Sequence, residues 1–291
     1  MTTRRQAIIR RRIFIAVVAT LLAAILALTT IIVVAIINNG HETNDVSSES
    51  SLEAVDTQSV ESETGDVSSE DELPSQFVTP TGVTLDANFS RLLLINGKNP
   101  LPDDYDTNVR EYLVEIDPKY RNNDNVTQIH KDIYPYITAM VAAAQADGVD
   151  LRVWSPFRSY AIQNDLFQKQ VNRVGGDEVK AATVVARPGT SEHNTGLCAD
   201  FNMASDTFES TDMYTWMCEN AEDYGFVLRY PKNKQSITGV IYESWHWRFV
   251  GINTAKEMNE LGVTLEEYIE MKDLDPAMDM YGDDSADKSA E

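Results

Sequence analysis

The stretch SEHNTGLCAD, residues 191–200, places a histidine and an aspartate seven positions apart in a chain that holds four histidines. His193 lies in a predicted loop, and the alternating residues that follow predict a strand carrying Asp200. His246 lies further along the chain, in ESWHWRF at 243–249. Catalytic zinc sites commonly use three His, Asp, Glu or Cys ligands and leave one position open. The two segments therefore predict a metal site formed by His193, Asp200 and His246.

Glu243 is the candidate general base, because a carboxylate close to an activated water can take its proton. The surrounding residues 239–250, GVIYESWHWRFV, are rich in β-branched and aromatic side chains and predict a strand. In a regular strand, Glu243 and His246 would face opposite sides, because they are three positions apart. We therefore expect a bend or bulge between them.

The N-terminal region predicts membrane attachment. Residues 13–37 form a run without a charged residue, and five arginines precede this run within residues 1–12. The run is long enough for a transmembrane helix, and the arginines predict a cytoplasmic N-terminus. A cleaved secretory signal is the alternative, but it would have a shorter apolar region and end in small residues. We expect a retained single-pass anchor in the cell membrane, with the remainder of the chain extracellular.

Two acidic segments flank the predicted folded part. Residues 38–84 contain eleven acids and no Lys or Arg, which predicts a disordered tether, and residues 273–291 predict a loose acidic tail. The net charge of −22 argues against nucleic acid as a partner, since that would need a basic surface. We expect a monomer.

Residues 85–272 predict one α+β domain. Helical periodicity and capping signals predict helices over 131–147, 159–172 with Ser159 as N-cap, 177–186 and 211–224. Strands are predicted at the start of 91–105, up to the turn at Ser155-Pro156, over 197–202, at 226–230 and over 239–250. Arg158 follows the turn at a strand-to-helix junction, a place where side chains often face a cleft.

The two cysteines, Cys198 and Cys218, leave two possibilities open. An oxidising exterior would permit one disulfide between them, whereas two buried free thiols fit the spacing equally well.

Both histidine segments carry a family resemblance. SEHNTGLCAD resembles the S-x-H-x-x-G-x-A-x-D motif, and ESWHW resembles the E-x-x-H-W motif, of the VanY-type D-alanyl-D-alanine carboxypeptidases. NPLPDDY at 99–105, SPFRSY at 155–160 followed by Gln163, and YGFVLRYP at 224–231 fall in the order of the family. The resemblance spans about residues 91–255 and is specific when its segments are taken together.

The resemblance implies a zinc carboxypeptidase on the hedgehog-like α+β fold, which cuts the terminal D-alanine from peptidoglycan stem peptides. The motif positions imply zinc ligands at His193, Asp200 and His246, a catalytic base at Glu243, a substrate-binding arginine at Arg158, and residues near the substrate backbone at Ser191 and Gln163.

Cys198 departs from the motif, which has alanine at this position. A thiol there would either compete for the zinc or pack as a small apolar residue, and we expect packing.

Two alternatives to the D,D-carboxypeptidase remain. An L,D-carboxypeptidase acting on tetrapeptide stems would use the same ligands and would differ in the shape of its pocket. A non-catalytic cell-wall-binding domain would keep the zinc, but it would need neither Glu243 nor Arg158.

Overall fold

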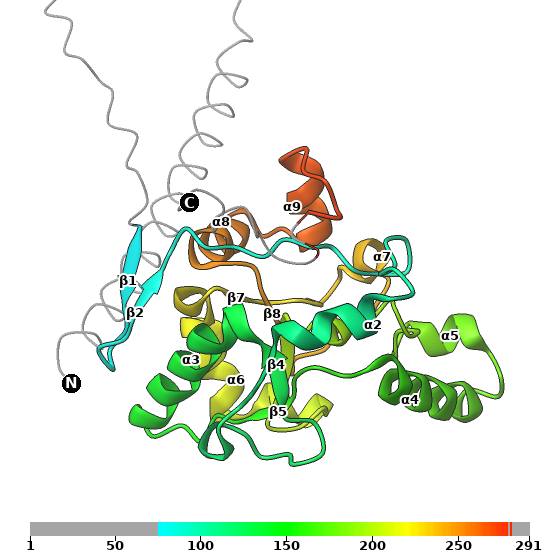
Figure 1. Cartoon of the computed structure of the whole chain (residues 1–291), viewed down its shortest axis with the longest axis horizontal. Coiled ribbons are helices and arrows are strands. Elements are labelled where there is room, and N and C mark those ends of the chain that lie inside the picture. The colour runs from blue at the N-terminus through cyan, green and yellow to red at the C-terminus, as the bar shows by residue number, and fades with distance from the viewer. Residues whose placement is uncertain (1–74, 279, 281–291) are drawn as a thin grey trace, which may run out of the picture. The chain divides into compact units, whose positions relative to one another are not determined.

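The computed structural model describes residues 75–278 and 280, and an antiparallel sheet of order β5-β6-β8-β7 lies at their centre (Figure 1). Its strands are β5 (Val153–Ser155), β6 (Cys198–Phe201), β8 (His246–Phe249) and β7 (Phe226–Leu228). Two further antiparallel pairs are β1 (Gln76–Val78) with β2 (Thr84–Asp86) and β3 (Leu113–Glu115) with β4 (Gln128–His130). Together with the helices, these strands confirm the predicted α+β class.

The helices largely follow the predictions made from periodicity. Figure 1 shows α4 and α5 together at one side of the molecule, away from α3 and α6. Ser159 caps α4 by accepting a hydrogen bond from the backbone N–H of Ile162, as predicted. The helix predicted at 177–186 is shorter than expected. The bounds are α2 (Tyr105–Asn108), α3 (Tyr134–Ala146), α4 (Tyr160–Arg173), α5 (Glu178–Ala182), α6 (Asp212–Asn220), α7 (Gln235–Thr238), α8 (Ile252–Leu261) and α9 (Leu265–Met271).

The register of the central sheet aligns three polar residues. Asp200 of β6 pairs with His246 of β8 on one side and with Ser155 of β5 on the other. Residues directly opposite one another in antiparallel strands have Cβ atoms about 5 Å apart on the same face. The sheet therefore presents Ser155, Asp200 and His246 as one row.

Gly196 positions the motif loop against β4. Its φ is +70°, and a Cβ built on it would lie 2.9 Å from the backbone nitrogen of His130. That nitrogen donates to the Gly196 carbonyl at 3.1 Å. Only glycine combines this conformation with so close an approach, so the residue fixes the path from His193 to Asp200.

Three clusters of buried side chains support this arrangement. The main core packs α3 and α6 with the sheet and includes Trp247 and Phe249. A second cluster joins residues 92 and 94 to β7, α8 and α9, and a small third cluster lies between α4 and α5. Because side chains alternate along β8, His246 and Arg248 face away from Trp247 and Phe249.

Two predicted strands differ from the structure. Residues 91–95 form no strand, although Arg91 to Ile95 are buried and pack against the domain. The strand predicted over 239–250 begins only at His246, and the preceding residues form loop and turn. β8 includes only the residues that pair with β6 or β7. Apolar composition does not show where this pairing begins, so it predicted too long a strand.

The predicted boundaries at both ends of the domain were too narrow. β1 and the start of β2 lie before residue 85, within the segment predicted as a tether. After residue 272, Leu274 and Met278 pack against the α8–α9 cluster, and the Pro276 carbonyl accepts from the Leu94 N–H at 2.9 Å. The start of the predicted loose tail is therefore part of the folded domain.

The predicted cytoplasmic segment 1–12, the transmembrane helix 13–37 and most of the tether lie outside the described residues. Within the described part of the chain, no helix combines the length and apolar character needed to span a bilayer.

Candidate metal centre and active site

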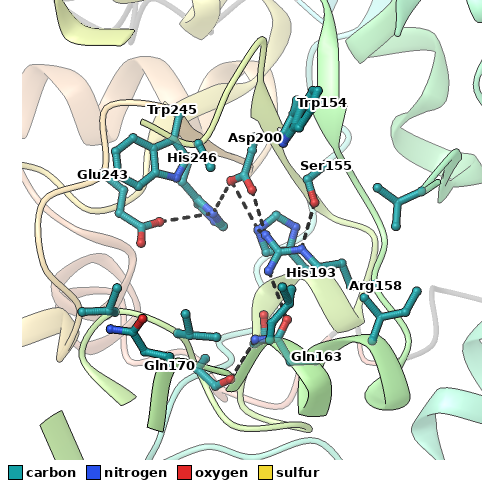
Figure 2. Close-up of a pocket in the computed structure, with 18 of the residues that line it drawn as sticks. Trp154, Ser155, Arg158, Gln163, Gln170, His193, Asp200, Glu243, Trp245 and His246 are labelled. Atoms are coloured by element: carbon teal, nitrogen blue, oxygen red, sulfur yellow. Dashed lines mark hydrogen bonds and ion pairs between the residues drawn. The ribbon is translucent and has the colours of Figure 1, made fainter. Parts of the chain in front are cut away.

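The three predicted metal ligands converge on the central sheet (Figure 2). Asp200 Oδ1 lies 3.4 Å from His193 Nε2 and 3.2 Å from His246 Nδ1. The two imidazole rings are nearly perpendicular, with centroids 4.8 Å apart. His193 comes from the short 3-10 turn η4 (Glu192–Asn194), and all three side chains are buried. The structure thus brings the two histidine segments together.

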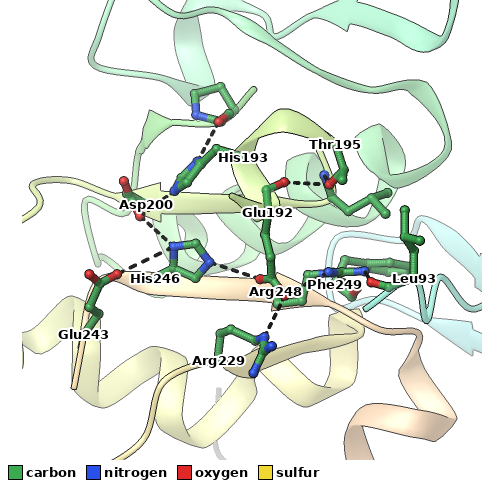
Figure 3. A network of polar contacts seen from close by, with 12 residues as sticks. Leu93, Glu192, His193, Thr195, Asp200, Arg229, Glu243, His246, Arg248 and Phe249 are labelled. Atoms are coloured by element: carbon green, nitrogen blue, oxygen red, sulfur yellow. Dashed lines mark hydrogen bonds and ion pairs between the residues drawn. The ribbon is translucent and has the colours of Figure 1, made fainter. Parts of the chain in front are cut away.

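Each histidine is anchored through the nitrogen that faces away from Asp200. His193 Nδ1 donates to the Pro156 carbonyl at 2.8 Å, and His246 Nε2 lies 3.3 Å from Glu192 Oε2 (Figure 3). Metal-binding histidines usually donate their second ring N–H to a carbonyl or carboxylate in this way. The remaining nitrogens, His193 Nε2 and His246 Nδ1, face Asp200.

The guanidinium of Arg158 contacts two of these three side chains. Its Nη2 lies 2.6 Å from His193 Nε2 and 2.7 Å from Asp200 Oδ2. Its Nε donates to Ser155 Oγ at 2.8 Å and its Nη1 to Gln163 Oε1 at 3.1 Å. The imidazole of His193 and the carboxylate of Asp200 jointly bind this guanidinium, so the space between them favours a positive charge. The donor set therefore fits a zinc ion.

Gln163 and Ser191 both line the cleft, and their predicted place near the substrate backbone stays a prediction. The amide of Gln163 is already engaged on both sides, because its oxygen accepts from Arg158 and its nitrogen donates to the Ala186 carbonyl at 2.7 Å. Gln163 therefore holds Arg158 in place. Ser191 is buried at the start of η4, two positions before His193.

Glu243 lies beside His246, with Oε2 3.8 Å from Nδ1. A turn at Ser244 and Trp245 separates Glu243 from β8 and supplies the predicted bend, so that both side chains reach one site. The Glu243 side chain is buried, and this desolvation raises its pKa to about 7, although His246, His193 and Arg158 oppose the shift. An acid with such a pKa suits proton transfer near neutral pH.

Asp200 stays ionised despite its burial. Desolvation would raise its pKa, but His193 and Arg158 beside it hold the pKa well below its ordinary value. The two buried acids of the site therefore differ, with Asp200 suited to binding a cation and Glu243 to exchanging a proton.

Cys198 is a free, buried thiol, and Cys218 is free and exposed, so the structure contains no disulfide between them. Burial would raise the pKa of Cys198, but His193 and His246 lower it to about 7. The ligand atoms of Cys198 and the two histidines lie within 4.8 Å of one another, as do those of Asp200, Glu243 and His246. The predicted packing role of Cys198 stays a prediction.

The cleft above these residues has a volume of about 460 Å³. Apolar side chains of α4 and the segment after α5 form one wall, and Trp154 and Trp245 lie on the side of the sheet. Asn123 and Asn125 add polar groups. A cleft of this size takes a short peptide, with the candidate metal centre on its lining.

Sequence reasoning missed a set of buried charges behind His246. Glu192 is 1% exposed and contacts His246, Arg229 and Arg248. Glu192 lies within the motif, between Ser191 and His193, and this position was the one sign in the sequence that it belongs to the site. Two of its partners, His246 and Arg248, lie on β8 and the third, Arg229, directly follows β7, so their pairing could not be read from spacing.

Two imidazoles and a carboxylate converge at an antiparallel sheet, with an acid and an arginine beside them in a cleft, and this arrangement is typical of metal-dependent hydrolases. The VanY family model, described as D-alanyl-D-alanine carboxypeptidase, matches residues 126–252. The chain belongs to this family, which confirms the predicted resemblance.

Two relatives show the extent of the similarity. YodJ of Bacillus subtilis (strain 168), named as a carboxypeptidase, is 37% identical over 187 residues, which cover 62% of this chain and 67% of YodJ. A D-alanyl-D-alanine carboxypeptidase of Enterococcus faecalis (strain ATCC 700802 / V583) is 35% identical over 185 residues, covering 61% of this chain and 65% of the relative. The alignments thus leave about a third of each relative unmatched.

Solved structures show the same fold. VanYB in complex with D-alanine-D-alanine has 37% identity and a TM-score of 0.53, covering 62% of this chain and 98% of the other. The LD-carboxypeptidase LdcB has 37% identity and a TM-score of 0.55, covering 61% and 84%. A D,D-pentapeptidase VanY variant in complex with Zn(II) has 36% identity and a TM-score of 0.50, covering 61% and 98%.

Proposed function

We propose that the protein is a zinc-dependent carboxypeptidase that removes the terminal D-alanine from peptidoglycan stem peptides. The observation that carries the proposal is the position of Glu243, a buried acid with a pKa near 7 beside the converging ligands. A domain that only bound the cell wall through zinc would have no use for such an acid or for Arg158 in the cleft.

His193, Asp200 and His246 would hold the zinc. The arrangement of these donors supports the assignment, and so does the Zn(II) complex of a VanY relative. When bound, zinc supplies Lewis acidity that polarises a peptide carbonyl and lowers the pKa of water.

Glu243 performs the proton transfers in this proposal. Its carboxylate takes a proton from the attacking water and then gives that proton to the nitrogen of the leaving amino acid. A pKa of about 7 allows both transfers near neutral pH, since neither the acid nor its base is then strongly disfavoured. Burial in the cleft keeps bulk water away from the carboxylate.

Arg158 orients the substrate. A guanidinium offers a planar fork of donors that matches a carboxylate or a developing oxyanion. Ser155 and Gln163 fix the plane of this fork through Nε and Nη1, which points Nη2 at the ligand atoms. The geometry supports contact with the peptide carbonyl or with the terminal carboxylate next to it.

Two comparisons support different stem peptides. VanYB was solved with D-alanine-D-alanine, which supports a D,D-carboxypeptidase acting on pentapeptides. The LD-carboxypeptidase LdcB has the same sequence identity to this chain as VanYB and a similar TM-score, which supports the L,D alternative on tetrapeptides. We favour the D,D activity because the matching family model carries that description.

We also propose that residues 13–37 anchor the enzyme in the cell membrane, with the catalytic domain outside. The uncharged run and the five arginines before it support this orientation. The substrate, a cell-wall peptide, would then meet the enzyme on the outer side.

The proposal is tested with the full chain purified in detergent and incubated with muramyl pentapeptide or tetrapeptide, while mass spectrometry follows released D-alanine. Release from pentapeptide that stops with a chelator and returns with zinc establishes the D,D activity. Release from tetrapeptide alone establishes the L,D activity. If zinc binds but neither peptide is cut, the non-catalytic binding domain replaces the enzyme.

A further inference from the structure

Glu192 is a fully buried carboxylate placed directly behind His246. Its Oε2 lies 3.3 Å from His246 Nε2, while its Oε1 accepts from Arg229 Nε at 2.7 Å and from Arg248 Nη1 at 3.0 Å. Figure 3 shows the carboxylate between the imidazole on one side and the two arginines on the other. The residue of η4 next to His193 thus supports the other histidine, which begins β8.

The arginines connect this carboxylate to parts of the chain far from the motif. Arg229 forms a two-pronged ion pair with Glu266 at the start of α9, with distances of 2.8 and 2.7 Å. Arg248 donates through Nη2 to the Arg91 and Leu93 carbonyls, at 3.2 and 2.8 Å. Every guanidinium nitrogen of Arg229 and Arg248 therefore donates at least one hydrogen bond.

The charges of the four side chains cancel. Glu192 and Glu266 supply two negative charges, and Arg229 and Arg248 supply two positive ones, with exposed fractions of 1% or less for Glu192 and both arginine side chains. A buried group of this kind is stable only when every member keeps its partner, because a single unpaired charge costs about 3–5 kcal/mol. Glu192 is therefore held in one position.

We infer that Glu192 is the positioning residue of His246, and that Glu266 holds it there through Arg229. The inference rests on the proposed metal site. A carboxylate only accepts, so Glu192 favours the neutral imidazole that carries its proton on Nε2. The Nδ1 lone pair, on the side of Asp200, is then free for the proposed metal ion. Helix α9, which lies beyond the family match ending at residue 252, thereby becomes part of the support of the metal centre.

The test measures zinc affinity of the full chain by competition with a coloured chelator, for wild type and for Glu192→Gln and Glu266→Gln. We expect affinity to fall roughly 10- to 100-fold for Glu192→Gln, the usual effect of losing such a partner, and by a smaller factor for Glu266→Gln. Glu270→Gln is the matched control, since it removes an exposed carboxylate from the same helix. We expect its affinity to equal that of wild type.

Two further readouts separate positioning from folding. Thermal unfolding of the metal-free variants shows whether the domain is intact, and the visible spectrum of the cobalt-substituted protein reports the geometry of the ligands. Glu266 is the more accessible member of the group, so Glu266→Gln keeps the test open if Glu192→Gln does not fold.

Zinc affinities and cobalt spectra equal to wild type in a folded Glu192→Gln or Glu266→Gln would overturn the inference and leave the proposed function intact. A wild-type chain that binds no zinc would remove the proposed metal site itself, and the inference with it.

Discussion

The burial of Glu243 suits this residue to the proposed proton transfer but lowers the stability of the folded protein near neutral pH. Burial raises its pKa from 4.5 to about 7. Between these two values the unfolded chain has released its proton while the folded protein retains it. The free energy of unfolding therefore falls as pH rises through this window, and the ionised carboxylate is a cost to stability near neutral pH.

Replacing Glu243 by glutamine should therefore stabilise the metal-free protein. At pH 8 we expect a gain of roughly 1–3 kcal/mol in the free energy of unfolding, because the amide has no charge to desolvate. At pH 4.5 the gain should largely vanish. Urea denaturation at the two pH values measures both quantities, and an equal effect at each would exclude the desolvation argument.

The same substitution should abolish turnover. We expect Glu243→Gln to bind zinc as wild type does while kcat falls about 10²- to 10⁴-fold, the usual contribution of a general base. In the wild type, kcat should decline as pH drops below about 7, where Glu243 holds its proton. Retained activity in the variant would assign the proton transfer to another group.

Cys198 offers a further test at the scale of one side chain. If the thiol only packs, Cys198→Ala should keep one zinc per chain and lose no more than about 1–2 kcal/mol of stability, since one buried sulfur is removed. Cys218→Ala, at the exposed cysteine, is the matched control. Metal analysis after dialysis decides, and loss of zinc in Cys198→Ala alone would make the thiol a ligand.

At the scale of elements, the site depends on how η4, β6 and β8 meet. The row of Ser155, Asp200 and His246 exists because three strands pair in one register. A shift by one residue would turn each side chain to the other face. Gly196 secures this register where the motif loop passes β4.

Gly196→Ala should consequently damage both stability and metal binding. The φ of +70° and a contact of 2.9 Å with backbone leave no room for a methyl group. We expect a loss of about 1–3 kcal/mol together with weaker zinc binding. Gly239→Ala is the control, because Gly239 has a similar φ of +77° and open space around it. Equal effects at both positions would attribute the loss to φ alone.

Element boundaries set by neighbouring residues could be predicted from the sequence. Boundaries set by contacts with distant residues could not. Helix α4 begins at its capping serine as expected, since a cap acts within one turn. The strand predicted over 239–250 was too long, because its apolar side chains line loop and turn before β8 begins. The motif positions predicted three candidate ligands that do lie close together, whereas the pairing of Glu192 with Arg229 depends on tertiary contact.

At the scale of the whole molecule, metal and folding should be linked. In the proposed site, zinc is held by His193, Asp200 and His246, which converge in the folded protein, so zinc should stabilise the folded state. At a 1,000-fold excess over Kd the gain is about 4 kcal/mol, which for a domain of this size raises Tm by roughly 10 °C. Calorimetry with zinc and with chelator measures this, and Asp200→Asn should show little of the rise. A wild-type Tm that ignores zinc would contradict the linkage.

The contacts of Arg229 and Arg248 also set a lower limit on the fragment that keeps these buried charges paired. A piece cut at residues 126–252 would retain each predicted ligand yet remove Glu266 and the Arg91 and Leu93 carbonyls. The stranded guanidiniums would cost several kcal/mol, comparable with the whole stability of a typical domain. Transplanting the site into another protein thus requires at least residues 91–266, so the structural unit is larger than its recognisable motifs.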